Sequence, residues 1–107
     1  MHVLHTIAST RRDHGGTSRS IPRLCEALSD AGVQVTLHTS RPPASAGAAA
    51  EPILPSGGVR TVLLDGGEGV TAVAGRGRRL RASMAAAAER AGAEIVHDHG
   101  AWLASNR

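Results

Sequence analysis

Short segments rich in β-branched and aliphatic residues alternate with helix-forming patterns along the chain, and this alternation limits the fold more than any other feature. We expect strands at 2–8, 33–39, 59–64 and 95–97. Between the first two strands, Ile21, Leu24, Cys25 and Leu28 recur at the spacing of one helix face. A second helix is expected over 76–91. This order predicts an α/β fold with a Rossmann-like parallel sheet flanked by helices.

The first helix carries signals at both of its ends. Thr17, Ser18 or Ser20 can cap its start, and Pro22 is expected in its first turn, where the missing N–H has no partner to lose. Gly32 is expected at the left-handed position after the last turn. Cys25 lies on the apolar face and is therefore predicted to be a core residue, not a nucleophile.

Four strands and two helices make about half of a doubly wound domain. We therefore expect residues 1–107 to form an incomplete domain with one sheet face lacking cover. The core must be built from small aliphatic residues, because the chain has no Phe or Tyr and a single Trp. The segment 40–58 contains four prolines and a run of alanines, which predicts a flexible loop instead of a packed element.

The 12 basic residues are all Arg; with nine carboxylates they give a net charge of +3 and a pI of about 11.0. A cationic chain invites a nucleic-acid interpretation. We do not adopt it, because the Ala, Arg and Gly bias runs through the whole sequence. One cysteine excludes an internal disulfide and fits a reducing compartment. No apolar run reaches the roughly 20 residues that span a bilayer, so a cytoplasmic location is expected.

A glycine-containing loop between the first strand and the first helix is one candidate binding site. Its sequence is His14-Gly15-Gly16-Thr17-Ser18. In parallel α/β folds, ligands bind beyond the carboxyl ends of the strands, and a helix N-terminus there suits a phosphate group. A flexible loop with a Thr or Ser cap explains the same residues about equally well. The segment is neither a GxGxxG fingerprint nor a Walker A loop.

The second candidate site follows the fourth strand at His97-Asp98-His99-Gly100. His97 and His99 point to one side of an extended chain and Asp98 to the other. Two imidazoles there can bind a metal, hold a hydroxyl or move a proton. The alternative is one buried, hydrogen-bonded histidine and one solvated histidine. Trp102 can stack on a sugar or a lipid, although a single Trp more often fills a core.

In order along the chain, these segments resemble glycosyltransferase family 4 enzymes. The resemblance rests on the opening His2-Val3-Leu4-His5, the run from His14 to Leu28, the junction Ala31 to Leu37, and the stretch Ile95 to Leu103. Family members have two Rossmann-like domains facing across a cleft, the GT-B arrangement. The resemblance implies that this chain is the N-terminal, acceptor-side domain of a retaining transferase that uses a nucleotide-sugar donor.

The same resemblance assigns roles to individual residues. His99 and His97 are implied to be catalytic, facing the cleft near the transferred sugar. Contacts to the donor diphosphate are implied for Gly15, Gly16, Thr17 and Ser18. Acceptor contacts are implied for His14, Trp102 and Asn106. The family needs no bound metal or other cofactor.

The resemblance also implies partners. These are a UDP- or GDP-sugar, a glycan, lipid or small-molecule acceptor, and a donor-binding half in a missing C-terminal domain or a separate subunit. The family's paired glutamates would lie in that half, so residues 1–107 alone are expected to be inactive. Nucleic acid is not an expected partner, and peripheral membrane contact is left open.

Two other interpretations remain. A metal-dependent hydrolase could use His97 and His99, but it needs further ligands and no histidine follows His99. The other is a non-catalytic Rossmann-like binding module or fragment.

Overall fold

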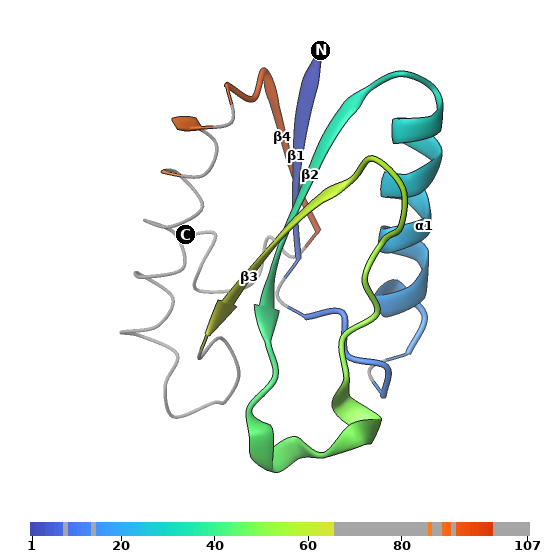
Figure 1. Cartoon of the computed structure of the whole chain (residues 1–107), viewed down its shortest axis with the longest axis vertical. Coiled ribbons are helices and arrows are strands. Elements are labelled where there is room, and N and C mark those ends of the chain that lie inside the picture. The colour runs from blue at the N-terminus through green and yellow to red at the C-terminus, as the bar shows by residue number, and fades with distance from the viewer. Residues whose placement is uncertain (8, 14, 66–85, 87–88, 91, 100–107) are drawn as a thin grey trace.

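The computed structural model describes residues 1–7, 9–13, 15–65, 86, 89–90 and 92–99. Its elements are β1 (His2–Thr6), α1 (Thr17–Asp30), β2 (Gln34–Arg41), the 3₁₀ turns η1 (Ala44–Ala46) and η2 (Ala48–Ala50), β3 (Arg60–Asp65) and β4 (Ile95–Asp98). The strands form one parallel sheet in the order β3-β2-β1-β4 (Figure 1). The predicted α/β class with a Rossmann-like parallel sheet is therefore confirmed at this level, and the strands fall within a few residues of their expected ranges.

The strand register sets which side chains share a face of the sheet. His5 of β1 lies opposite Leu37 of β2 on one side and His97 of β4 on the other. Residues paired in this way point to the same face, and their chain neighbours point to the opposite face. Thr6 accordingly pairs with His38 and Asp98 on the second face.

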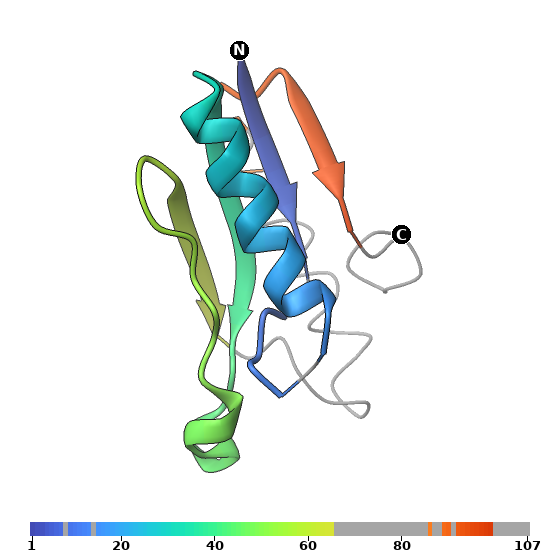
Figure 2. The same cartoon turned by 90° about the vertical axis from the view of Figure 1, so that its right-hand side faces the viewer.

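Helix α1 covers the first face and packs mainly on β2 (Figure 2). Ile21 and Cys25 of α1 meet Val35 and Leu37 of β2 in the core, with Ile7, Leu28, Val33 and Val59 packed around them. Cys25 is fully buried, as predicted for a core residue, and burial raises the pKa of its thiol to about 11. Strand β4 lies at the edge of the sheet beyond the area that α1 covers (Figure 2).

The C-terminal end of α1 forms the predicted glycine cap. Gly32 has a φ of 91°, and its N–H donates to the Ser29 carbonyl at 3.0 Å. The N–H of Val33 donates to the Leu28 carbonyl at 3.0 Å. These two bonds are the Schellman pair, and both Val33 and Leu28 pack against the core beside them.

The N-terminal end of α1 corrects two expectations. The N-cap is Gly16, with no side-chain hydrogen bond, so none of the predicted hydroxyl caps is formed. Because the helix already begins at Thr17, Pro22 is its sixth residue and lies outside the first turn. Its ring nitrogen cannot donate to the carbonyl of Ser18. The helix continues because Pro22 is buried and the next turn carries the core residue Cys25.

The segment after β2 has contacts that the sequence did not indicate. Ala50 is fully buried, and Arg11 and Pro52 form an isolated antiparallel bridge. The N–H of Ile53 donates to the Thr10 carbonyl at 2.9 Å. The expectation that no part of 40–58 packs is therefore wrong around 50–53, because backbone pairing joins this stretch to the loop after β1. Its flexibility stays a prediction.

Most of the expected second helix, 76–91, lies outside the described residues; Ala86, Glu89 and Arg90 are helical. Gly92 follows with a φ of 64°. In the described part of the chain, no helix is long and apolar enough to cross a lipid bilayer.

Candidate functional site

Three histidines, one in β1, one in the edge strand β4 and one directly after β4, meet on the same side of the sheet as α1. We call His5, His97 and His99 the histidine cluster. The ring centroids of His97 and His99 are 4.1 Å apart, and each lies 5.2 Å from that of His5. Each residue offers a nitrogen, and these three atoms lie within 4.8 Å of one another. The predicted shared side of His97 and His99 is therefore confirmed.

Backbone pairing places His99 beside the end of β1. Its N–H donates to the Thr6 carbonyl at 2.9 Å, which extends the β1–β4 pairing by one residue. Its Nε2 and the Nδ1 of His5 are hydrogen-bonded at 2.9 Å. One of these nitrogens carries the proton and the other accepts it, so the bond fixes the orientation of the His99 ring.

The three rings differ in their exposure to solvent. His5 is 2% exposed, His99 is half-buried and His97 is exposed. The alternative of one buried and one solvated histidine therefore describes the pair only in part, because His99 is the more enclosed member and uses a third histidine as its partner. The cluster is open to solvent on the His97 side.

Burial makes the inner part of the cluster uncharged at neutral pH. Burial, and then the neighbouring imidazoles of His99 and His97, lower the pKa of His5 to about 4. The pKa of His99 is also lowered, first by burial and then by His97, while Asp98 acts in the opposite direction. Neutral imidazoles have lone pairs free to accept a proton or to bind a metal ion.

The opposite face of the same strands carries a second polar group of residues. The hydroxyl of Thr6 donates to Oδ1 of Asp98 at 2.8 Å. His38 is buried, and its two ring nitrogens have no hydrogen-bond partner among the described residues. Burial, and then the positive charge of Arg90, lower its pKa. Asp98 is therefore engaged on the face away from the histidine cluster.

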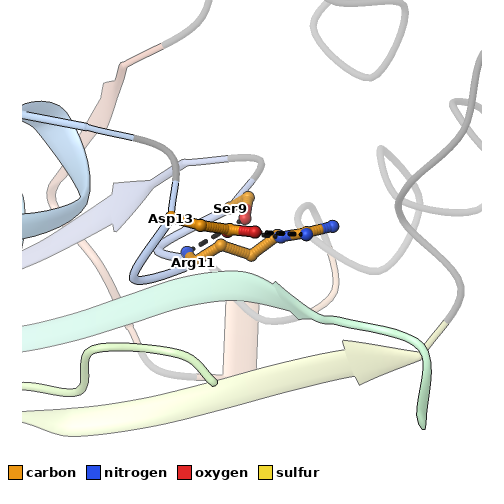
Figure 3. A network of polar contacts seen from close by, with 3 residues as sticks. All are labelled: Ser9, Arg11 and Asp13. Carbon is orange, nitrogen blue, oxygen red and sulfur yellow. Dashed lines mark hydrogen bonds and ion pairs between the residues drawn. The ribbon is translucent and has the colours of Figure 1, made fainter. Parts of the chain in front are cut away.

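The loop after β1 runs from the carboxyl end of that strand to Gly15 and Gly16. Its turn is organised by Arg11, whose N–H donates to Oγ of Ser9 at 3.1 Å (Figure 3). The Arg11 guanidinium makes a two-pronged contact with the Asp13 carboxylate at 2.9 and 2.7 Å. Gly15 follows with a φ of 83°, a conformation that favours glycine. Gly16 has a helical φ of −60°, and a Cβ built there meets no atom within 4 Å.

Buried hydroxyl groups without partners gather near the carboxyl ends of β1 and β2. Four such groups have no hydrogen-bond partner among the described residues: Thr10, Ser18, Thr39 and Ser40. Thr10 follows β1, Ser18 is the second residue of α1, and the other two lie near the end of β2. Unpaired buried polar groups are rare in folded proteins and need a reason, such as a bound water, ion or ligand. The carboxyl ends of β1 and β2 thus bury polar groups, whereas the neighbouring core buries aliphatic ones.

A shallow basic pocket lies on another side of α1. Its volume is about 140 Å³, and it is lined by Arg12, Arg19, Pro22, Arg23, Glu26 and Ile53. Glu26 accepts hydrogen bonds from the N–H and hydroxyl of Ser56 at 3.0 and 3.2 Å. No residue of the histidine cluster lines this pocket. Arg19 and Arg23 are four residues apart in the predicted helix, so the sequence already placed them side by side on its surface. This spacing is the feature of the sequence that indicated a basic surface here.

The predicted site residues fall into three groups. His97 and His99 come together as expected. Gly15 and Gly16 lie directly before α1, Thr17 and Ser18 are its first two residues, and of these four only Ser18 is buried. The predicted acceptor contacts His14, Trp102 and Asn106 lie outside the described residues.

His5 is the site residue that the sequence reasoning missed. The further ligand that a metal site needs does not follow His99; the third histidine is at position 5, on the first strand. A signal was present, because the usual Rossmann order places the first and fourth strands side by side. In that order, histidines near the carboxyl ends of the first and fourth strands come into the same region of the sheet.

Comparison of the chain with protein-family models, curated protein sequences and solved structures gives no match.

Proposed function

We propose that the chain is the acceptor-side domain of a nucleotide-sugar-dependent glycosyltransferase of the GT-B type. One observation carries the proposal. His97 and His99 stand where β4 ends, beside β1, and the order β3-β2-β1-β4 changes direction between these two strands. Ligands of open α/β sheets bind at such a point, beyond the carboxyl ends of the strands. The loop with Gly15 and Gly16 starts from the carboxyl end of β1, at the same end of the sheet.

The N-terminus of α1 supports a contact with the donor diphosphate. The first N–H groups of a helix have no partner within the helix, and among the described residues no side chain caps α1. A diphosphate would accept hydrogen bonds from these groups and would gain from the partial positive charge of the helix end. The open space around Gly16 allows a ligand to approach the backbone closely.

His99 is the proposed catalytic residue and His5 its positioning residue. In the transferase, the His99 imidazole would contact the transferred sugar and act mainly in the transition state. The hydrogen bond to His5 holds that ring in one orientation before substrate binds. The exposed His97 lies on the solvent side, where it can contact the sugar-accepting substrate.

The donor would be a UDP- or GDP-sugar, held mainly by a second domain or subunit that faces these strand ends. The acceptor would be a glycan, a lipid or a small molecule. The isolated chain would then bind the nucleotide-sugar weakly. A sub-micromolar donor affinity for residues 1–107, measured by calorimetry, would refute the division of the site between two halves.

The decisive experiment joins the chain to a donor-binding half, by fusion or co-expression, and measures sugar transfer. His99→Ala is expected to reduce turnover by about 10²–10⁴-fold with a smaller effect on donor affinity. Gly16→Val is expected to abolish donor contact. Gly16→Ala is the matched control for folding, because no atom meets its Cβ and its φ suits any residue. Full turnover with both Gly16→Val and His99→Ala would show that the active site does not lie at the carboxyl ends of β1 and β4.

A further inference from the structure

The histidine cluster has the composition and spacing of a transition-metal site. Its three candidate nitrogens lie within 4.8 Å of one another, and two of the residues belong to paired strands of one sheet. His99 is tied to β1 by its backbone N–H. The site is therefore built on rigid elements, which keeps the three rings close without any bound group.

The hydrogen bond inside the cluster is close to the spacing that a metal ion needs. Nδ1 of His5 and Nε2 of His99 are 2.9 Å apart. Two imidazole nitrogens on a tetrahedral zinc ion lie about 3.3 Å apart, given Zn–N bonds of about 2.0–2.1 Å. If the two nitrogens moved apart by a few tenths of an ångström, a metal ion could take the place of the proton that they share. The exposed His97 can turn toward the same point by side-chain rotation.

The other nitrogen of the His5 ring, Nε2, points away from this position, because the two nitrogens of an imidazole are directed apart. His5 is 2% exposed, and its Nε2 has no hydrogen-bond partner among the described residues. A buried polar atom without a partner is costly. Nε2 is therefore a separate polar atom of His5 and is not a ligand of the same ion; the candidate site depends on the spacing of the three rings.

The type of ligand selects the type of metal. A set of imidazoles without carboxylates suits zinc, cobalt, nickel or copper ions and does not suit magnesium or calcium. The nearest carboxylate in sequence, that of Asp98, accepts the Thr6 hydroxyl on the other face. Three protein ligands leave one position of a tetrahedral ion open, and in this cluster the exposed side is that of His97.

We propose that His5, His97 and His99 bind one zinc ion, with a fourth coordination position open to solvent at the carboxyl ends of β1 and β4. This inference departs from the metal-independent chemistry that the resemblance implies, and it does not depend on the proposed glycosyltransferase function. Metal binding is measured on the chain alone, whereas sugar transfer needs a donor-binding half, so either proposal can fail while the other stands.

Cobalt titration tests the site directly. Residues 1–107 are prepared without a histidine tag, stripped with a chelator and titrated with Co²⁺ while the visible spectrum is recorded. We expect one equivalent of Co²⁺ to give the intense visible bands of a four-coordinate centre. Added zinc should displace the cobalt and remove these bands. His97→Ala and His99→Ala are each expected to weaken zinc binding by more than about 100-fold, since loss of a direct ligand should exceed the 10- to 100-fold cost of losing a supporting group.

The variants are chosen so that folding does not decide the result. His97 is exposed, so its replacement leaves the core intact, which circular dichroism checks. His2→Gln is the matched control, because His2 belongs to the same strand as His5 but bonds to Thr36 on the opposite face. Retained binding in His2→Gln and lost binding in His97→Ala and His99→Ala support the site. No cobalt bands, or equal affinity in all variants, would overturn it.

Discussion

The apolar core and the histidine cluster occupy neighbouring positions on one face of the same sheet. Leu37 and His5 lie opposite each other in register, and neither is more than 2% exposed. On the β2 side, Leu37 packs with Ile21 and Cys25 beneath α1. On the β4 side, His5 meets two further imidazoles, and its buried Nε2 has no hydrogen-bond partner in the part of the chain that the structure describes. A single step across the sheet replaces hydrophobic packing by polar groups.

This difference separates the part of the sheet that stabilises the fold from the part that is suited to a ligand. Apolar burial stabilises at about 25 cal/mol per Å², whereas an unpaired buried polar atom costs about 1–3 kcal/mol. A chain without Phe or Tyr has little apolar area to offset such costs. Buried imidazoles beside a small aliphatic core are therefore expected to serve binding or chemistry more than stability.

Leu37→Ala should cause the largest loss of stability. The side chain is fully buried among the core residues, and removing it should lower the free energy of unfolding by about 2–5 kcal/mol. Urea unfolding followed by circular dichroism measures the change. Leu54→Ala is the control; Leu54 is exposed, so its change should stay within about 0.5 kcal/mol. Equal effects of the two substitutions would mean that the core is not where the structure places it.

Acid should destabilise the protein through the histidine cluster. The pKa of His5 is about 4 in the folded chain and about 6.5 when unfolded, so between these values the unfolded state binds more protons and stability falls as pH decreases. His5 alone should contribute about 3 kcal/mol that is present above pH 6.5 and lost on approach to pH 4. Urea unfolding over this pH range, with chelator present, measures the loss.

His5→Leu isolates this contribution, because leucine does not titrate. The variant should keep a shallower pH dependence, in part from His38, whose pKa burial also lowers. Its core should remain folded, since Leu37 in the paired position is already apolar. An unchanged pH dependence in His5→Leu between pH 6.5 and 4 would contradict the buried, neutral state of His5.

The two glycines before α1 should differ in their tolerance of a side chain. Gly15 has a φ of 83°, so Gly15→Ala should lower stability by about 1–2 kcal/mol. Gly16 has a helical φ and free space around it, so Gly16→Ala should change stability by less than about 0.5 kcal/mol. Thermal unfolding of the two variants side by side is the measurement. A larger loss for Gly16→Ala would disagree with the structure of this loop.

Asp13→Asn should have the smallest effect. It removes the charge that faces the Arg11 guanidinium in a solvent-accessible loop, and such pairs contribute up to about 1 kcal/mol. The difference from the unchanged protein should shrink as salt is added, since salt screens the pair. Unfolding at low and high ionic strength measures both. A loss that salt does not reduce would point to a packing role for Asp13.

The sequence was sufficient for features that depend on residues close together in the chain. The strands, the helix over 17–30 and the left-handed Gly32 follow from spacing and from the missing Cβ of glycine. The common side of His97 and His99 follows from the alternation of an extended chain. Each of these features depends on a preference that acts over a few residues, so the local sequence contains the necessary information.

Tertiary structure decided the features that join distant segments. His5 meets His99 across 94 positions because β1 pairs with β4, and no local pattern gives the register of that pairing. Ile53 pairs with Thr10 for the same reason. The helix continues through Pro22 because burial against the sheet outweighs one lost hydrogen bond. Local propensities determine which elements form, whereas the burial of surface between elements decides which of their side chains meet.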